Sequence, residues 1–385
     1  MKSYDYIIVG AGAAGLQLAY FMAKDPFFTS RKILVLDSNK KTQNDRTWCF
    51  WEKEKGIFEN ILYKTWDSAL FASSYYTSSI KLAPYRYKMI RGIDFYEYVL
   101  STLHKNESFD IRYETVKDIN DQGSFVRVET NIEGYSAKKV FSSVFDPKPM
   151  LAQKDHPVLQ QHFIGWFVKT ERPVFNPEEV TFMDFTVTQK GNTRFMYVLP
   201  FSKHEALVEY TLFSEDLLPQ ADYENAIKEY LLELEAGTYE ITDTERGSVP
   251  MTTFDFKQGN TPNFIKIGTA GGWTKASTGY TFKNTQQKAS LLVSYLKEGR
   301  SLKSFNAANR FTFYDGILLD ILQRKNHLGA FIFSKLFKRN KAEKIFKFLE
   351  DKTSLPEEIR IMASVADIHF TMAFFRYLIK GFRRN

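Results

Sequence analysis

Residues 4–24 read Tyr-Asp-Tyr-Ile-Ile-Val-Gly-Ala-Gly-Ala-Ala-Gly-Leu-Gln-Leu-Ala-Tyr-Phe-Met-Ala-Lys, and this stretch decides the fold. The apolar run at 4–9 predicts a buried strand, and the segment 13–24 predicts a helix. Residues 32–36 predict a second strand, which is followed directly by Asp37. Consecutive strand, helix and strand segments form a β-α-β unit, so we expect the two strands to be parallel neighbours in one sheet.

The turn between the first strand and the helix has the spacing Gly-x-Gly-x-x-Gly, at Gly10, Gly12 and Gly15. In a dinucleotide-binding turn, these glycines allow the tight turn, the approach of the pyrophosphate, and the close packing of helix on strand. The pyrophosphate would lie at the helix N-terminus, beside Ala14, where free N–H groups favour anions. Asp37 would accept hydrogen bonds from ribose hydroxyls. The motif alone does not separate FAD from NAD.

A second glycine-rich segment, residues 268–272, again lies between a predicted strand (263–268) and a predicted helix. We count Gly268, Ala270 and Gly271 as cofactor-binding candidates in it. Two such turns, far apart in the chain, favour a large flavin dinucleotide that spans the sheet over a nicotinamide cofactor. The alternative is a turn that has no part in ligand binding.

The middle of the chain predicts an antiparallel sheet, and the end predicts helices. Four short alternating segments predict the strands, at 160–170, 180–188, 193–200 and 205–213. An acidic amphipathic helix is expected next, at 221–236. We therefore predict an α/β protein with a Rossmann-type FAD-binding domain built on a parallel sheet, an inserted antiparallel β-sheet substrate domain, and a helical C-terminal region. The three parts are predicted, in that order, at 1–75, 105–150 and 245–300; at 76–104 and 151–244; and at 301–385.

Composition restricts the class of protein. The 385 residues are 44% hydrophobic and 25% charged, as in a folded protein, so general disorder is excluded. The aromatic content of 16% indicates either a large apolar or flat ligand or an aromatic-rich core. A single cysteine, Cys49, excludes intrachain disulfides and thiolate zinc sites. There is no signal-peptide pattern and no run of about 18 apolar residues, so we expect a cytoplasmic protein without a spanning helix.

Two kinds of partner are not expected. The six histidines are scattered, and no P-loop, nucleophile elbow or metal-binding motif is present, so we predict no metal. Aromatic residues do not alternate with basic ones as they do in nucleic-acid sites, so we predict no nucleic-acid partner.

The net charge of +7 belongs to the C-terminal tail, where 14 Lys and Arg stand against 6 Asp and Glu from Arg324 onward. Basic amphipathic segments at 331–339 and 374–384 predict peripheral contact with an anionic membrane surface. The alternative is that their apolar faces pack on the body of the protein.

Residues 44–51 follow the β-α-β unit and place a cation beside two indoles. Arg46 is a candidate contact for a phosphate or a flavin ring. Trp48 and Trp51 are candidates for the lining of an apolar site. The alternative is that these are ordinary loop and core residues.

Two carboxyl groups lie within apolar strands. Strand alternation places Glu209 on one face with Leu207 and Thr211. A carboxyl against an apolar wall keeps its proton more easily, so it can act as an acid near neutral pH. A solvent-facing glutamate on an edge strand is the alternative, and Asp184 has the same two interpretations.

Together these segments resemble the bacterial lycopene cyclase family, within the flavoprotein group that includes geranylgeranyl reductases and aromatic hydroxylases. The resemblance extends over nearly the whole chain, and the last 60 residues are the least diagnostic. The segments that carry it are Gly10-x-Gly12-x-x-Gly15, Arg46-Thr47-Trp48-Cys49-Phe50, Gln161-x-Phe163-x-Gly165-Trp166, Met183-Asp184-Phe185, Tyr197-Val198-Leu199-Pro200, Val208-Glu209-Tyr210-Thr211, Ala270-Gly271-Gly272 and Ser277-Thr278-Gly279-Tyr280.

The resemblance implies an enzyme that binds FAD, with NADPH as the electron donor that reduces the flavin, and a reaction without net redox change. In this reaction a proton adds to the end of the linear polyene lycopene, the neighbouring double bond closes a ring, and a ring proton is lost. By the same resemblance Glu209 is the acid and Asp184 a second carboxyl. Gly279 joins the cofactor-binding residues and Tyr280 the substrate-binding ones. The enzyme would work at the cytoplasmic side of the inner membrane, where lycopene is dissolved.

This chain departs from the family pattern at Lys275-Ala276-Ser277, where the family often has His-Pro. The number of rings formed and the ring isomer therefore stay open. Two alternatives share the glycine motifs: an FAD-dependent isoprenoid reductase or hydroxylase, and a flavin-containing carotenoid-binding protein without turnover.

Overall fold

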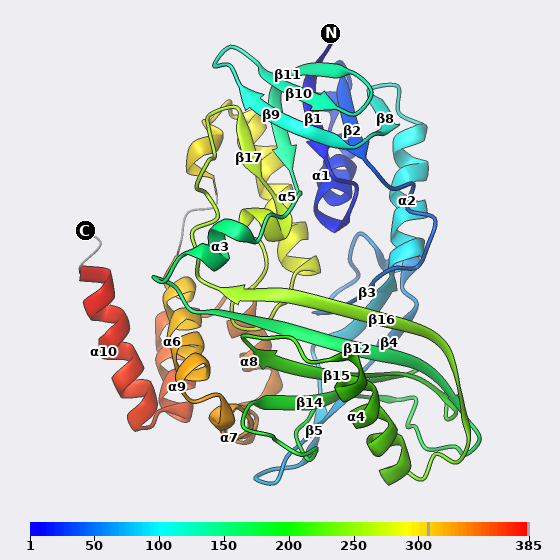
Figure 1. Cartoon of the computed structure of the whole chain (residues 1–385), viewed down its shortest axis with the longest axis vertical. Helices are drawn as coiled ribbons and strands as arrows, with labels where there is room; N and C mark the ends of the chain where they lie inside the picture. Colours follow the sequence, from blue (N-terminus) through cyan, green and yellow to red (C-terminus); the bar gives the residue numbers. More distant parts are fainter. Residues whose placement is uncertain (306–308, 383–385) are drawn as a thin grey trace.

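The computed structural model describes residues 1–305 and 309–382. Within them, two large sheets lie one above the other, and the C-terminal helices cover one end of the space between them (Figure 1). A small third sheet connects the large ones. It consists of β3 (Thr47–Glu52), β7 (Arg86–Arg91) and β4 (Lys64–Trp66).

The first sheet has the order β8-β2-β1-β11-β10-β9, with β17 beside β11. Its strands β8, β2, β1, β11 and β17 run parallel to one another, whereas β10 pairs antiparallel with both of its neighbours, β9 and β11. The predicted parallel pairing of the first two strands is therefore confirmed. The strands are β1 (Lys2–Val9), β2 (Ile33–Asp37), β8 (Phe109–Tyr113), β9 (Val116–Asp121), β10 (Val126–Thr130), β11 (Gly134–Ser142) and β17 (Phe264–Lys266).

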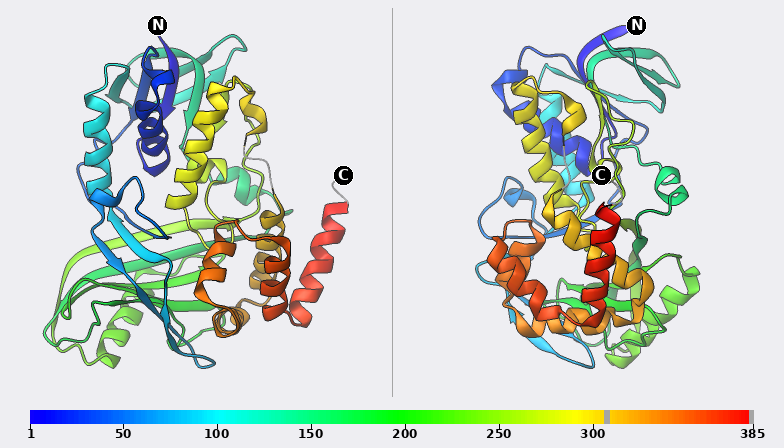
Figure 2. Two further views of the ribbon diagram at one scale, coloured as in Figure 1. Left: turned by 180° about the vertical axis from the view of Figure 1, so that it is seen from behind. Right: turned by 90° about the vertical axis from the view of Figure 1, so that its left-hand side faces the viewer.

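Three helices cover the first sheet. Helices α1 (Ala13–Lys24) and α5 (Phe282–Lys297) lie side by side, and α2 (Gly92–His104) packs along α1 (Figures 1 and 2). Their inward side chains form one apolar core, which includes the fully buried Leu16 and Phe95.

The second sheet has the order β16-β12-β15-β14-β13-β5-β6 and is antiparallel except where β13 runs parallel to β5. The four predicted strands are all present, and β14 has the predicted bounds. Helix α4 (Gln220–Glu233) packs on the face of this sheet that points away from the first sheet. The strands are β5 (Ser68–Ala72), β6 (Ser78–Lys81), β12 (Val158–Thr170), β13 (Glu179–Asp184), β14 (Thr193–Pro200), β15 (Glu205–Ser214) and β16 (Tyr239–Thr252).

The edge strand β16 was not predicted from the sequence. Its residues 241–247 read Ile-Thr-Asp-Thr-Glu-Arg-Gly and are mostly exposed, so the apolar alternation of a buried strand is missing. The strand forms because its backbone pairs with β12 over the whole length of the latter, from Val158–Thr252 to Thr170–Tyr239.

The sheets divide the chain differently from the predicted domain boundaries. Strand β5 belongs to the second sheet, although 1–75 was predicted as flavin domain. Helix α2 packs on α1, although 76–104 was predicted as substrate domain. In both places the side chains of one strand or helix pack on a different sheet from the segments next to it in the chain, so the domain boundary is displaced.

The C-terminal part is helical in the described residues, as predicted. Helices α7 and α8 pack their apolar faces on the body, whereas α10 lies at the outer edge of the molecule (Figure 1). No helix in the described ranges is both long and apolar enough to cross a membrane. The C-terminal helices are α6 (Arg310–Arg324), α7 (Gly329–Arg339), α8 (Ala342–Leu349), α9 (Leu355–Val365) and α10 (Ile368–Phe382).

The remaining helical segments are short. Helix α3 (Lys148–Ala152) precedes β12 of the second sheet. Turns of 3-10 helix lie at Pro26–Phe28, Glu59–Ile61, Gly268–Gly271, Leu302–Ser304 and Asn326–Leu328.

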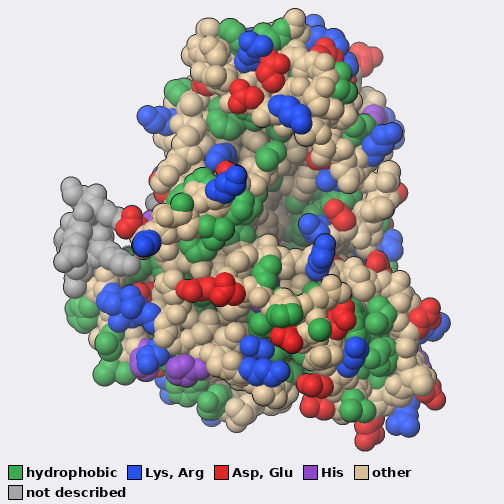
Figure 3. Space-filling model, viewed as in Figure 1, with side chains coloured by type: hydrophobic (Ala, Val, Ile, Leu, Met, Phe, Trp, Pro, Cys, Tyr) green, Lys and Arg blue, Asp and Glu red, His purple; other side chains and the backbone are tan. Residues whose placement is uncertain are grey.

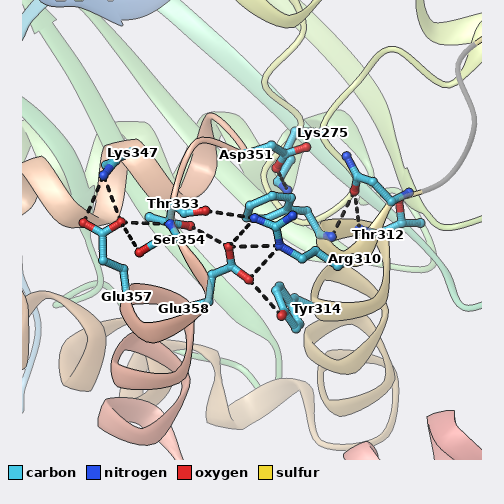
Figure 4. Close-up of polar contacts among 12 residues, drawn as sticks. Lys275, Arg310, Thr312, Tyr314, Lys347, Asp351, Thr353, Ser354, Glu357 and Glu358 are labelled. Atoms are coloured by element: carbon cyan, nitrogen blue, oxygen red, sulfur yellow. Dashed lines mark hydrogen bonds and ion pairs between the residues drawn. The ribbon is translucent and has the colours of Figure 1, made fainter.

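Buried ion pairs fasten these helices together and onto the loop that precedes α5 (Figure 4). The fully buried Glu358 of α9 accepts hydrogen bonds from the guanidinium of Arg310 at 2.9 and 3.0 Å. This contact lowers the pKa of Glu358. Lys275 in the loop pairs with Asp351 at 2.7 Å and with Asp315 of α6 at 3.0 Å. The helical region is thereby held over the cavity described next.

Candidate active site

A cavity of about 670 Å³ lies between the two large sheets and the helical region. Figure 3 shows the surface hollowed between the sheets. Gly12 and Gly268 line one end of the cavity, Glu209 lies in its wall, and Phe333 and Val365 line the end beneath the helices. The cavity therefore connects the predicted cofactor-binding turns with an apolar interior.

The first glycine turn has the geometry of a dinucleotide site. Gly10 has φ = +97°, which side chains disfavour, and a Cβ on Gly15 would overlap the carbonyl oxygen of Gly10. A Cβ on Gly12 would meet nothing within 4 Å, because Gly12 faces the cavity. The first and third glycines are thus required by the protein itself, whereas the second leaves space for a ligand.

Asp37 supports this turn. One of its oxygens accepts a hydrogen bond of 2.5 Å from the N–H of Ala11 and lies 3.7 Å from the Lys41 ammonium. The other accepts a hydrogen bond from the N–H of Asn39 at 2.7 Å. Asp37 is not among the cavity-lining residues, so its contact with a ribose stays a prediction.

The second glycine turn meets the first. Gly268 has φ = +62°, and a Cβ there would lie 2.7 Å from the Cβ of Ala14 at the start of α1. Ala270 and Gly271 are buried behind the cavity wall, where Gly271 packs directly on the backbone of Lys266. Gly279 has φ = +71° and lines the cavity. The predicted cofactor residues thus come together, with Ala270 and Gly271 shaping the turn rather than facing the space.

Unpaired polar groups at this end fit a flavin dinucleotide. The buried Oγ1 of Thr47 and Oε1 of Gln161 have no hydrogen-bond partner among the residues that the structure describes, and both residues line the cavity. The N-cap residue of α1 is Gly12, so this position supplies no side-chain cap to the free N–H groups of the helix. Free N–H groups there suit a pyrophosphate, and the two orphaned oxygens suit the donor groups of a flavin ring.

Strand β3 and the residue before it, Arg46, supply the three residues predicted after the β-α-β unit. Arg46 is exposed at its start and lines the cavity. Trp48 and Trp51 point to opposite faces of the strand. Trp48 stacks on Phe282 at 5.2 Å between ring centroids, and Trp51 meets Tyr280 edge-on at 4.2 Å. All three predicted residues, with Tyr280, line the cavity.

More aromatic side chains complete the wall around Trp51. Phe346 of α8 stacks on Trp51 at 4.7 Å. The ring centroids of Tyr87 and Phe182 are 4.6 Å apart. The hydroxyl oxygen of Tyr87 lies 2.8 Å from that of Tyr197. Tyr197 belongs to a segment that carries the family resemblance, whereas the sequence indicated the other three only through the high aromatic content. They come from strands and helices far apart in the chain. Aromatic faces of this kind stabilise cations.

Glu209 lies in the same wall and is only 7% exposed. Thr211 shares its face and also lines the cavity, whereas Val208 and Tyr210 pack on the opposite face toward α4, as the predicted alternation requires. Burial raises the pKa of Glu209 well above its ordinary value, and the nearby Glu245 raises it further. Within the described residues no group donates a hydrogen bond to its carboxyl. Its geometry suits an acid, and its role as the acid stays a prediction.

Asp184 lies elsewhere. Its carboxylate accepts hydrogen bonds from the N–H and hydroxyl of Thr186, at 3.0 and 2.5 Å, and from the hydroxyl of Tyr230 on α4 at 3.1 Å. It is absent from the cavity wall, although Phe182 of the same strand lines it. The register of β13 shifts between Thr181 and Asp184, which interrupts the alternation of faces. The second carboxyl expected beside Glu209 is therefore not Asp184.

The second carboxyl near Glu209 belongs to Glu245 of β16, which the sequence did not indicate. Its side chain lines the cavity, and its Oε1 accepts a hydrogen bond of 3.0 Å from the N–H of Thr47. Burial raises the pKa of Glu245, whereas Thr47 and the charge of Arg46 act to lower it. Nothing in its polar segment marks this residue, because its place depends on the pairing of β16 with β12.

Comparison with known proteins identifies the family. Residues 5–378 match the family model described as "Lycopene cyclase protein". The chain belongs to the lycopene cyclase family. The resemblance found in the sequence is therefore confirmed.

The individual relative that we compare matches a shorter part of the chain than the family model does. A lycopene beta-cyclase from Paracoccus sp. (strain N81106 / MBIC 01143) is 26% identical over 195 residues, which is 48% of this chain and 47% of that protein. The match thus spans about half of the curated relative.

Solved structures resemble the whole chain. A flavoprotein/dehydrogenase from Cytophaga hutchinsonii has a TM-score of 0.64 at 12% identity and covers 100% of both chains. A geranylgeranyl bacteriochlorophyll reductase-like protein from Thermoplasma acidophilum has a TM-score of 0.61 at 13% identity and covers 97% of this chain and 98% of its own. The flavin-dependent brominase Bmp2 has a TM-score of 0.59 at 13% identity and covers 100% of both chains. This likeness concerns the fold, and it confirms the predicted fold class.

Proposed function

We propose that this member of the lycopene cyclase family catalyses the redox-neutral cyclisation of the linear ends of lycopene to β-ionone rings. One observation carries the proposal: the carboxyl of Glu209 is buried in an aromatic cavity wall, and this burial raises its pKa well above the ordinary value. An acid that protonates an alkene needs this environment, because water would otherwise take the proton.

The proposed reaction uses this wall directly. The proton of Glu209 adds to the terminal double bond of lycopene, the neighbouring double bond attacks the tertiary cation, and loss of a ring proton leaves the mass unchanged. The faces of Trp51, Tyr280 and Trp48 would each stabilise the cation by about 0.5–2 kcal/mol. A bound reduced flavin would supply negative charge at the cavity that favours the cation.

We further propose FAD as the cofactor, reduced by NADPH, with its pyrophosphate at the N-terminus of α1. Support comes from the uncapped helix start and the orphaned oxygens of Thr47 and Gln161. The residues proposed to hold it or to shape its site are Gly10, Gly12, Ala14, Gly15, Asp37, Arg46, Gly268, Ala270, Gly271 and Gly279.

Expression of the chain in a lycopene-accumulating bacterium tests the function. We expect pigments of unchanged mass and shifted retention by chromatography and mass spectrometry, and their ring count distinguishes a mono- from a dicyclase. A product that has gained hydrogen or oxygen would instead support the isoprenoid reductase or hydroxylase. Unchanged lycopene with a folded, flavin-loaded protein would contradict the proposal and favour a carotenoid-binding role.

We also propose that α9 and α10 dock the protein on the inner membrane from the cytoplasmic side. Both helices have apolar residues on two sides: the inner ones, such as Ile361 and Phe370, line the cavity, and others are exposed. The exposed apolar residues are Leu355, Ile359, Ile368, Met372, Phe374 and Phe375. The tail around them is basic, which suits an anionic surface, although its residues Arg383 and Arg384 lie outside the described part of the chain.

The other tail segment with a predicted membrane contact, residues 331–339, lies in α7 and packs on the protein itself. In α7, Ile332 and Phe333 are buried against the body, so the alternative interpretation, packing rather than membrane contact, holds for this segment. Only the α9–α10 surface is left for the proposed membrane contact.

Exchange of Ile359, Ile368 and Phe375 for serine is expected to lower binding to anionic phosphatidylglycerol vesicles at least tenfold in a flotation assay, because each exposed side chain would lose its burial in the interface. The matched control exchanges Ile132 and Leu232, which are 67% and 79% exposed on other elements. Equal vesicle binding of both variants and the parent protein would remove α9 and α10 from this role.

A further inference from the structure

The structure brings two carboxyl groups together across a glycine. Gly165 in β12 is the register partner of Glu209 in β15 on one side and of Glu245 in β16 on the other. Both carboxyl side chains line the cavity. A Cβ at Gly165 would lie 2.6 Å from Cγ of Glu209, so only glycine leaves this space open.

The two carboxyls have different surroundings. Burial raises the pKa of Glu245, but the hydrogen bond from the N–H of Thr47 and the positive charge of Arg46 act in the opposite direction and favour its ionised form. No described residue donates a hydrogen bond to Glu209, and burial favours its neutral form. When the surroundings of two carboxyls push their pKa values apart, the one that stays neutral is suited to be the acid and the one that ionises is suited to be the base.

The other titratable groups around the pair do not disturb this assignment. Asp243 acts on Glu245 through its negative charge, against the effect of Arg46. Cys49 lies close to both carboxyls and is itself held neutral by burial, which raises the pKa of its thiol. Tyr197, the register partner of Glu209 in β14, is likewise held neutral. These groups leave the contrast between the two carboxyls in place: Glu245 has a backbone donor and a nearby cation, and Glu209 has neither among the described residues.

We propose that Glu245 is the catalytic base that removes the ring proton, paired with Glu209 as the acid. This inference rests on the proposed cyclisation. The O–H bond of Glu209 breaks as a C–H bond forms at the less substituted carbon of the terminal double bond, which leaves a tertiary cation, and the π electrons of the neighbouring double bond form the ring C–C bond. A ring C–H bond next to the cationic carbon then breaks, its electrons form the ring double bond, and the proton passes to Glu245.

One transfer restores the enzyme. After ring closure Glu209 is ionised and Glu245 protonated, so a proton moves across the gap at Gly165 from Glu245 to Glu209. No electrons are gained or lost over the cycle, and the proton count of the pair is unchanged.

The variant Glu245→Gln tests the proposal, with Glu240→Gln on the exposed part of the same strand as the matched control. We expect turnover of lycopene to fall by about 10²–10⁴-fold in Glu245→Gln, with unchanged flavin absorbance and unfolding temperature. The cation would still form, so the remaining product should shift to other ring double-bond isomers or to a compound heavier by one water. Glu245→Asp should restore part of the turnover and the original product.

The pH dependence adds a second measurement. In the parent protein, turnover should fall on the acid side as Glu245 becomes protonated, and this limb should disappear in Glu245→Gln. A variant with normal turnover, a single product and an unchanged acid limb would overturn the role of Glu245. Failure of the parent protein to cyclise lycopene would refute the proposed function itself, so the two failures are distinguishable.

Discussion

Replacement of Glu209 by glutamine is expected to abolish ring formation while the protein stays folded and loaded with flavin. Glutamine has nearly the same shape but cannot donate the proton that starts the reaction. General acids contribute about 10²–10⁴-fold to rate, and with no other acid in position we expect at least the upper end of that range. Pigment analysis with purified protein, together with flavin absorbance, measures both effects.

The folded state should tolerate this change. Burial raises the pKa of Glu209 above that of the unfolded chain, so its contribution to the free energy of unfolding decreases as pH rises above the ordinary glutamate range. Glutamine does not ionise, and the variant should therefore be at least as stable as the parent at pH 8. Activity of the parent should also decline at high pH, where Glu209 finally loses its proton.

Glu205→Gln is the matched control, since Glu205 lies on the same face of β15 but is exposed. It should cyclise lycopene at the parent rate. Near-normal turnover in Glu209→Gln would remove Glu209 from the reaction.

The second large effect is expected at the glycine turn, where two substitutions should fail in different ways. In Gly12→Val the new side chain would project into the cavity, so we expect a folded protein without flavin and without turnover. In Gly15→Ala the methyl group would overlap the backbone carbonyl of Gly10 and force α1 away from β1. We expect a loss of about 1–3 kcal/mol or more in stability, together with loss of flavin.

Thermal unfolding and the visible absorbance of bound flavin separate the two results. Gly123→Asn serves as the control, because Gly123 lies in a turn with φ = +85° and free space around it, which asparagine tolerates. Normal flavin content in Gly12→Val would mean that the dinucleotide does not bind at this turn.

Much of the fold could be predicted because its signals are local. The glycine spacing and the apolar run at the N-terminus define β1, α1 and β2, and period-2 alternation defines β14 with its observed bounds of 193–200. Strand β16 could not be predicted, because its polar residues carry no alternation and only pairing with β12 makes it a strand.

In the candidate site too, residues with a local sequence signal could be predicted and the others could not. Local motifs place Gly12, Gly268 and Trp51 at the cavity, and strand alternation gives Glu209 the correct face. The aromatic partners Tyr87 and Phe346 had no local signal, since each reaches the cavity from an element distant in the chain.

By itself, the sequence determined the fold class and the family, and strand alternation placed Glu209 on one face of β15 with Leu207 and Thr211. Only the tertiary structure decided which carboxyl stands beside that acid. A register shift in β13 turns Asp184 toward α4, and the pairing of β16 with β12 brings Glu245 to the other side of Gly165. Both outcomes depend on hydrogen bonds between strands, which the backbone N–H and C=O groups of almost any residue can form, so the local sequence around Asp184 and Glu245 does not show them.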